Sequence, residues 1–304
     1  MNNDSLVTMM FDNILLQKGE YFPSYVYRLM QFANFMEASN LLDILQISSA
    51  RKIGETLPRW VVVLVSQNYP EKKISQIVDD NLLGTYWRSF IEESEVAQFF
   101  YDQKHKPATG RVLFNGEKTL LPFQSIKLCP DCFSESVKSY GVGIWQAQHQ
   151  AATAFVCHKH QHVLYQRPVT QFKGLEFCQA FFDRDEYFQP QITIFHRWLD
   201  FETRRIFQMD SNLYREEVQL HKRVFMESSF YSSKPCLTTT NLNKQWIEAL
   251  YKYLYFLFPY ARSQAQLASQ SPLFKPSDIM DVDKTTHPLI YLLFKYFYLF
   301  EFKA

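Results

Sequence analysis

The chain has 304 residues, more than a single hydrophobic core usually supports, so we expect two or three folded units. Apolar residues make up 47% of it and aromatic residues 17%, which excludes an intrinsically disordered protein. Lysine and arginine number 32 against 31 aspartate and glutamate, so no overall field draws the chain onto nucleic acid or an anionic membrane. Any DNA contact has to come from a local basic patch.

The counts of glycine, proline and cysteine further limit the fold class and the cellular compartment that we expect. Only 8 glycines and 13 prolines are present, which suits helices with short connections. The five cysteines are an odd number, and three have metal-ligand spacing, which favours a reducing cytoplasm over a disulfide framework. The first residues, MNNDSLVTMMFDN, lack the basic and apolar regions of a signal peptide.

The N-terminal region reads as short helices. In residues 24–37, Ser24 is a predicted N-cap and one helix face carries Tyr25, Leu29, Phe32 and Met36. A second short helix, NLLDILQI, is followed by a polar stretch with Arg51, Lys52 and Arg59. This spacing is compatible with a helix-turn-helix whose basic residues face DNA, while a solvated loop between two core helices is the alternative.

The rest of the chain is predicted from its periodicity. Residues 60–67 fit either a helix or a strand, and residues 71–100 read as one or two helices. Residues 103–127 bring glycines, prolines and short alternating runs, which mark a domain boundary. Helices resume over 191–207, 213–227 and 243–258, and a polar connector at 263–278 precedes the apolar segment 288–302. That segment is too short to span a bilayer and is interrupted by charges, so we expect a buried helix and no membrane association.

We therefore predict a mainly α fold with three domains. They are an N-terminal helical, helix-turn-helix-like domain (1–102), a small zinc-binding domain (103–175) and a C-terminal helical domain (176–304).

The strongest chemical signal lies at residues 129–160, where a Cys-x-x-Cys pair is followed after a spacer by Cys-x-x-His. Two such pairs supply four ligands for one tetrahedral Zn²⁺, which we assign to Cys129, Cys132, Cys157 and His160. His162 is the alternative fourth ligand, whereas His158 directly follows Cys157 and shares the geometry less easily. Four protein ligands leave no open position, so the predicted ion is structural.

Signals for catalysis are absent from the sequence. It contains no Walker-type loop, no GxGxxG and no GxSxG. The acidic pairs at 79–80 and 92–93 are adjacent residues on predicted helices, so their side chains diverge. Tyr140, Gly141, Trp145 and His149, between the two Cys pairs, are expected to form a small core beside the ion. We expect no enzyme activity.

These motifs together resemble the TniQ/TnsD family of transposition target-selection proteins. The resemblance rests on CPDC, YGVGIWQ and CHKH followed by Leu164, with weaker matches at SYVYRL (24–29), DDNLLGTYW (79–87) and HPLIYLLF (287–294). It implies a non-catalytic protein of the bacterial cytoplasm that selects a target and recruits the AAA+ ATPase TnsC. The family's zinc ligands carry over onto Cys129, Cys132, Cys157 and His160.

Two departures from the family pattern are visible. The family often writes C-P-K-H-G at the second pair, whereas this chain has His158 in place of the proline and Gln161 in place of the glycine. The 24-residue spacer resembles the site-specific TnsD branch, for which the chain is short, so a natural short form and a truncated chain are both open.

The resemblance leaves two modes of target selection. A TnsD-like protein binds target DNA directly, and the basic residues available for this are Arg51, Lys52, Arg59, Arg197, Arg204, Arg205, Lys222 and Arg223. A Cascade-associated TniQ adaptor instead links an RNA-guided complex to TnsC through aromatic surfaces. Further partners left open are transposase subunits and a second copy of the chain in a homodimer.

Overall fold

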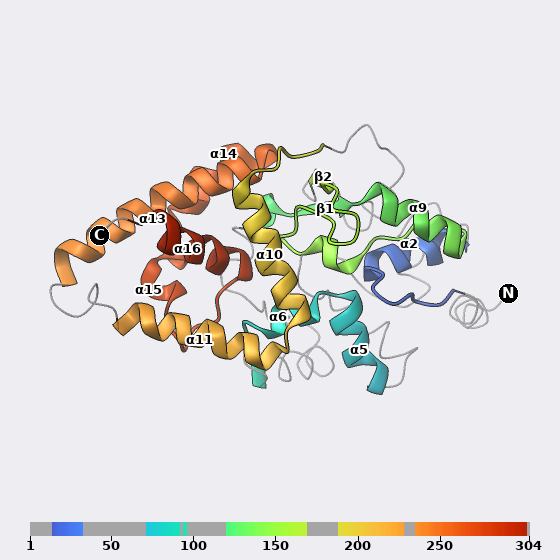
Figure 1. Ribbon diagram of the computed structural model, residues 1–304, viewed down its shortest axis with the longest axis horizontal. Coiled ribbons are helices and arrows are strands. Elements are labelled where there is room, and N and C mark those ends of the chain that lie inside the picture. Colours follow the sequence, from blue (N-terminus) through green and yellow to red (C-terminus); the bar gives the residue numbers. More distant parts are fainter. Residues whose placement is uncertain are drawn as a thin grey trace. The chain divides into compact units, whose positions relative to one another are not determined.

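The computed structural model describes residues 14–32, 71–91, 94–95, 120–168, 188–227 and 235–302, and it is mainly helical (Figure 1). The described residues form two compact units. The first contains those up to residue 84 together with 124–192, and the second contains those of 85–123 together with 193–302. The domain boundaries predicted after residues 102 and 175 lie outside the described residues and stay predictions.

Helix α2 (Phe22–Phe32) confirms the first predicted helix. Tyr25 and Leu29 are fully buried on its predicted face, whereas Phe32 is 43% exposed. The predicted N-cap is wrong, because the helix already begins two residues before Ser24. The Ser24 hydroxyl instead donates to Glu20 Oε1 at 3.1 Å and accepts from the Trp145 N–H at 3.1 Å, which ties α2 to the loop before η2 (Ala147–Gln150).

A buried ion pair fixes the segment that precedes α2. Arg28 donates from Nε and Nη2 to the two carboxylate oxygens of Glu20 at 2.8 and 2.5 Å. Asn81, the last residue of α5 (Glu71–Asn81), donates to the Glu20 carbonyl at 2.6 Å and the Gln17 carbonyl at 2.9 Å. Burial raises the pKa of Glu20, and the Arg28 guanidinium opposes that shift.

A small hairpin and helix complete the first unit. Strands β1 (Ser125–Leu128) and β2 (Tyr165–Pro168) pair antiparallel, with Ser125 opposite Pro168 and Leu128 opposite Tyr165. Helix α9 (Pro130–Tyr140) starts directly after β1. The 157–160 segment lies shortly before β2, so the two strands bring both Cys-containing segments to the same end of the hairpin.

The second unit is built from helices that confirm the predicted C-terminal pattern. Its long members are α10 (Ile194–Gln208), α11 (Ser211–Glu227), α13 (Pro235–Leu257) and α16 (Pro288–Phe300). Residues 84–88 form the short helix α6 (Gly84–Arg88), and residues 121–123 the 3₁₀ turn η1 (Leu121–Phe123).

The polar connector predicted at 263–278 is wrong, since this region folds into short helices. They are α14 (Arg262–Ser269), η8 (Pro272–Phe274) and α15 (Pro276–Ile279), and the 3₁₀ turn η7 (Pro259–Ala261) precedes them. The reason is that Ala265 and Ala268 lie one turn apart and are buried, which gives α14 a narrow apolar face that packs on α13. Polar residues on the remaining faces hide that periodicity in the sequence.

Helix α16 is the centre of the second unit, and the prediction of a buried apolar helix is confirmed. Its Phe294 ring lies 5.0 Å from Trp246 and 5.3 Å from Phe225, both edge-on. At its N-terminus His287 acts as N-cap and accepts the Leu289 N–H at Nδ1, at 3.1 Å. No helix within the described residues combines the length and hydrophobicity that a bilayer crossing requires.

The His287 ring also packs edge-on against Trp87, with centroids 5.0 Å apart. These two residues belong to the DDNLLGTYW and HPLIYLLF segments on which the family resemblance partly rests. Two motifs far apart in the sequence are therefore in direct contact within the second unit.

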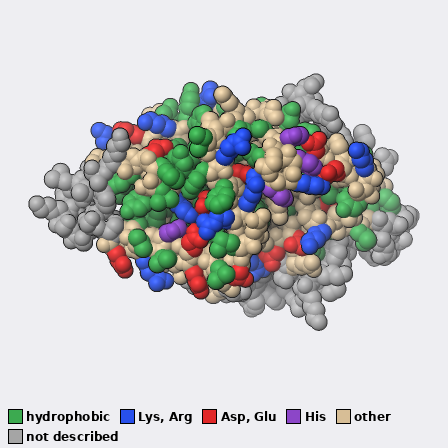
Figure 2. All heavy atoms as spheres, viewed as in Figure 1, with side chains coloured by type: hydrophobic (Ala, Val, Ile, Leu, Met, Phe, Trp, Pro, Cys, Tyr) green, Lys and Arg blue, Asp and Glu red, His purple; other side chains and the backbone are tan. Residues whose placement is uncertain are grey.

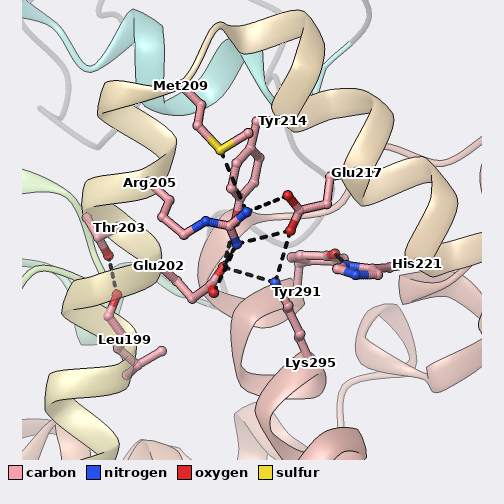
Figure 3. Close-up of polar contacts among 10 residues, drawn as sticks. All are labelled: Leu199, Glu202, Thr203, Arg205, Met209, Tyr214, Glu217, His221, Tyr291 and Lys295. Atoms are coloured by element: carbon pink, nitrogen blue, oxygen red, sulfur yellow. Dashed lines mark hydrogen bonds and ion pairs between the residues drawn. The ribbon is translucent and has the colours of Figure 1, made fainter.

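A partly buried network of charges joins α10, α11 and α16 (Figure 3). Glu202 accepts from Lys295 Nζ at 3.0 Å, from the Tyr214 hydroxyl at 3.1 Å and from Arg205 at 3.2 Å. Glu217 accepts from Arg205 at 2.5 Å and from Lys295 at 3.4 Å. Two carboxylates thus neutralise two cations, so the network joins three helices while the buried Glu202 and Lys295 carry opposite charges.

The predicted helix-turn-helix and the ambiguous segment 60–67 fall on residues 33–70, which lie outside the described part of the chain.

Candidate metal centre

The first pair of cysteines sits on the first turn of α9. Cys129 is the N-cap with an extended backbone, and Pro130 occupies the first helical position, where its missing N–H costs nothing. Cys132 follows one turn later, so the two thiols project to one side of the helix start. Both side chains are buried, at 0% and 8% exposure.

The second pair lies on a tight turn between residues 157 and 161. The Gln161 N–H donates to the Cys157 carbonyl at 2.8 Å, and the Cys157 N–H donates to the His162 carbonyl at 2.7 Å. Gln161 has φ of 57°, in the left-handed region that glycine adopts without strain. This is the position where the family pattern has glycine, so the departure noted in the sequence falls on the one strained residue of the turn.

The four predicted residues converge in space. The ligand atoms of Cys129, Cys132, Cys157 and His160 all lie within 4.8 Å of one another. His160 Nδ1 is 3.5, 3.3 and 3.7 Å from the sulfurs of Cys129, Cys132 and Cys157, and the Cys132 and Cys157 sulfurs are 3.6 Å apart.

These separations match the edges of a metal-centred tetrahedron. With zinc bonds of about 2.3 Å to sulfur and about 2.0 Å to nitrogen, edges should measure roughly 3.8 Å between sulfurs and roughly 3.5 Å between sulfur and nitrogen. The cluster could therefore hold one metal ion with all four positions filled by protein. Such a site offers no open position for water or substrate.

His160, and neither of its histidine neighbours, belongs to the cluster. His162 is exposed, and its Nδ1 lies 2.6 Å from Asp131 Oδ2. His158 is also exposed, and its ring lies 6.3 Å from that of His149. Among the described residues the geometry groups His160, and not His162, with the three thiols, and His160 as the fourth metal ligand stays a prediction.

Glu135 orients the His160 ring from outside the cluster. Its Oε1 lies 3.1 Å from His160 Nε2, and its other oxygen is paired with Lys159. Because Nδ1 faces the sulfurs, Nε2 is left to donate to the carboxylate, an arrangement typical of metal-bound histidines. A role for Glu135 was not predicted from the sequence. Pro130 predicts a helix start there, and a helix from Pro130 places Glu135 one turn beyond Cys132.

The crowded thiols of the cluster shift the pKa values of one another. Hydrogen bonds from Cys129 and Cys132, and then from the backbone N–H groups of His160 and Lys159, lower the pKa of Cys157 to about 2. Hydrogen bonding to Cys129 and Cys157, together with burial, raises the pKa of Cys132, since crowded sulfurs resist a second negative charge. Glu135 raises the pKa of His160 to about 9. A divalent ion would supply the charge that lets all three thiolates form together.

The residues between the two pairs form the expected core only in part. Trp145 is fully buried and His149 is 2% exposed, whereas Tyr140 is 50% exposed and lies outside that core. Gly143 is required by packing, because a Cβ there would lie 2.0 Å from the Phe133 ring.

The predicted DNA-contacting residues have varied surroundings. Arg204 pairs with Asp200 at 2.5 Å, and Arg205 pairs with Glu202 and Glu217 in the charge network of α10, α11 and α16. Lys222 Nζ donates to the carbonyls of Asp281 and Lys284 at 2.9 and 2.8 Å, and burial lowers its pKa to about 8. Arg197 and Arg223 are exposed, while Arg51, Lys52 and Arg59 lie outside the described residues. DNA binding by this set stays a prediction.

Comparison with known families matches residues 14–164 to the TniQ family model. This span contains all four residues of the Cys₃His cluster. Searches of the curated proteins and of the solved structures gave no match.

Proposed function

The chain is a TniQ family protein, and from this premise we propose that it selects the insertion site of a cut-and-paste transposon. In this role it binds target DNA and recruits a TnsC-type AAA+ ATPase, which in turn engages the transposase. The chain itself carries out no chemical step.

The observation that supports this role best is the closed Cys₃His cluster inside the TniQ span. We propose that it binds one structural Zn²⁺, because three thiolates and one imidazole in a tetrahedron suit zinc better than oxygen-seeking ions. With four protein ligands the ion stabilises the first unit, and it has no position left to activate water. Metal analysis of the purified chain should give one zinc per molecule.

Direct, sequence-specific binding of target DNA is tested by an electrophoretic mobility titration of the chain against the flanking target site at two salt concentrations. We expect specific binding that weakens steeply with salt, because contacts to phosphates release counterions. Binding no tighter than to unrelated DNA would remove this part of the proposal.

The alternative is an adaptor that links an RNA-guided Cascade complex to TnsC. It is supported by the near-zero net charge and by the carboxylate or carbonyl partners of Arg204, Arg205 and Lys222. Co-purification with Cascade, together with the absence of specific DNA binding by the isolated chain, would favour the adaptor. Both roles share recruitment of the ATPase, which a binding assay with the purified TnsC-type protein tests.

A further inference from the structure

A cavity in the second unit lies beside helix α11. Its volume is about 360 Å³, and its wall includes the apolar side chains of Phe90, Ile91 and Val218. The buried polar residues Ser89 and Lys222 line it as well, and we call this space the Ser89 cavity. The residues of the metal cluster belong to the first unit, so this cavity is separate from the metal centre.

The Ser89 side chain is a buried hydroxyl that lacks a partner. Its exposure is 0%, and its Oγ makes no hydrogen bond within the described part of the chain. Buried polar groups in folded proteins almost always have such a bond, because losing the bond to water without a replacement is unfavourable. Since Ser89 lines the cavity, an acceptor atom of a bound ligand can supply the missing partner.

Two cations that line the Ser89 cavity have no carboxylate partner among the described residues. Lys222 is 4% exposed, and its Nζ donates to two backbone carbonyls and a hydroxyl at 2.9, 2.8 and 3.2 Å. Arg215 donates from Nε and Nη2 to the Arg88 carbonyl at 3.2 and 2.7 Å. These neutral acceptors leave both positive charges uncompensated. A buried charge without a counter-charge is unfavourable, and burial accordingly lowers the pKa of Lys222 to about 8.

The negative charges of the Ser89 cavity lie at its exposed edge. Glu95 and Asp283 line the cavity, and both residues are exposed. The third cation of the wall, Lys284, is already paired with Asp278 and, at 3.6 Å, with Asp281. The cavity therefore has uncompensated cations that are buried or half-buried, and carboxylates that are solvated. This arrangement suits a ligand whose anionic end enters first.

We propose that the Ser89 cavity binds the carboxylate group of a small organic ligand whose short apolar chain lies against the apolar wall. One carboxylate oxygen accepts the Ser89 hydroxyl, and the negative charge compensates Lys222 and Arg215. A volume of about 360 Å³ is at the small end of the range for ligand sites, so the ligand is a small molecule and not a polymer. The proposal goes beyond target selection and does not depend on it.

A carboxylate suits this cavity better than a phosphate does. The Lys222 ammonium already uses its three N–H groups, so the donors left for an anion belong to Ser89, Arg215 and Gln219. These few donors match the two oxygens of a carboxylate, whereas a phosphate has more oxygens and a larger negative charge that the carboxylates at the edge repel. On the face shown in Figure 2, Lys and Arg side chains are interspersed with Asp and Glu side chains, so local groups have to select the anion.

Probes of matched length test the charge requirement on the purified, metal-loaded full chain. Butyrate carries the carboxylate, butyramide is its neutral counterpart, and 4-aminobutyrate adds an ammonium that would face Glu95 and Asp283. Affinities are measured by ligand-observed NMR titration at constant ionic strength, with inorganic phosphate as a fourth probe. We expect butyrate to bind at least about tenfold more tightly than butyramide. The added ammonium should tighten binding by a further factor of about two to five.

Three variants assign the binding to this cavity. Ser89→Ala removes a hydroxyl that has no partner in the described chain, so it should unfold at the wild-type temperature and yet bind butyrate about tenfold more weakly. Lys222→Met should weaken butyrate binding at least as much and leave butyramide binding unchanged. The matched control, Lys252→Met, removes an exposed lysine of α13 outside the cavity and should bind butyrate as the wild type does. If Lys222→Met fails to fold, because it loses three hydrogen bonds, the Ser89→Ala result decides alone.

Equal affinities for butyrate and butyramide would overturn this inference, and so would equal butyrate affinities of Ser89→Ala and the wild type. Phosphate bound more tightly than butyrate, with the same dependence on Ser89, would show that the carboxylate assignment is wrong. None of these results bears on target selection, which the DNA and ATPase titrations test separately.

Discussion

Glu135 Oε1 lies 3.1 Å from Nε2 of His160, while Nδ1 of the same ring faces three cysteine sulfurs. One carboxylate thus fixes both the orientation and the tautomer of the only imidazole in the cluster. We expect Glu135→Gln to weaken metal affinity about 10- to 100-fold, because the ring loses its charged acceptor. Competition with a chromophoric chelator measures the change.

Asp131→Asn is the matched control for that prediction. It removes a carboxylate of the same helix that pairs with His162, outside the cluster. Equal losses of affinity in the two variants would show that general surface charge, and not the orientation of His160, sets the affinity.

The fourth ligand can be identified by removing each histidine in turn. His160→Ala should lose most of the bound metal and destabilise the first unit by several kcal/mol, at least about 3 kcal/mol, because metal binding is coupled to folding. His162→Ala should keep one ion, since its side chain is 61% exposed and points to Asp131. Inductively coupled plasma mass spectrometry gives the metal content, and chelator-dependent thermal unfolding gives the stability. Metal loss in His162→Ala alone would contradict the assignment.

Gln161 is the strained residue of the second metal-binding turn, with φ of 57°. Its Nε2 donates to the His158 carbonyl at 2.7 Å, which offsets part of the strain. We expect Gln161→Gly to leave the free energy of unfolding within about 1 kcal/mol of wild type, and Gln161→Val to lower it by about 1–2 kcal/mol. Urea denaturation of the metal-loaded chain measures the free energy of unfolding of both variants. A valine variant as stable as the glycine variant would show that the backbone relaxes at this position.

His196 makes the second unit sensitive to acid. Its Nδ1 accepts the Thr193 N–H at 3.2 Å at the start of α10, and burial lowers its pKa from 6.5 to about 4. The unfolded chain therefore binds a proton at a higher pH than the folded chain does. Stability from this group is complete above pH 6.5 and is lost as the pH falls towards 4, by at most about 3 kcal/mol.

Replacing His196→Gln keeps an acceptor for the N-cap but removes the titration. The difference in unfolding free energy between wild type and this variant should therefore change between pH 7 and pH 4. A constant difference over that range would show that His196 does not titrate on folding.

The parts of this molecule that local sequence patterns determine could be predicted. The helices α10, α11, α13 and α16 follow from apolar periodicity, and the cluster of Cys129, Cys132, Cys157 and His160 follows from ligand spacing. Helix α14 could not be predicted, because its buried face consists of alanines whose burial depends on α13.

Polar contacts between residues far apart in the chain could not be predicted from the sequence either. Ser24 has the sequence of an N-cap, but its hydroxyl serves a backbone N–H of Trp145 that lies 121 positions later. The role of Glu135 required knowing which His160 nitrogen faces the sulfurs. Whether a lysine or arginine can contact DNA depends on its ion pairs in the folded chain. Arg205, for example, is paired with Glu217, and counting charges along the sequence does not reveal this pair.

The contact between Trp87 and His287, and the hydrogen bond from Thr285 to Glu95 across 190 positions, have a consequence for synthesis of the chain. The second unit needs residues from both sides of the first, so it cannot close until the last helix has left the ribosome. The first unit is complete well before that, with all four cluster residues translated. Residues 85–91 therefore emerge early, and apolar side chains such as Phe90 and Ile91 stay uncovered until the later helices of the second unit pack on them.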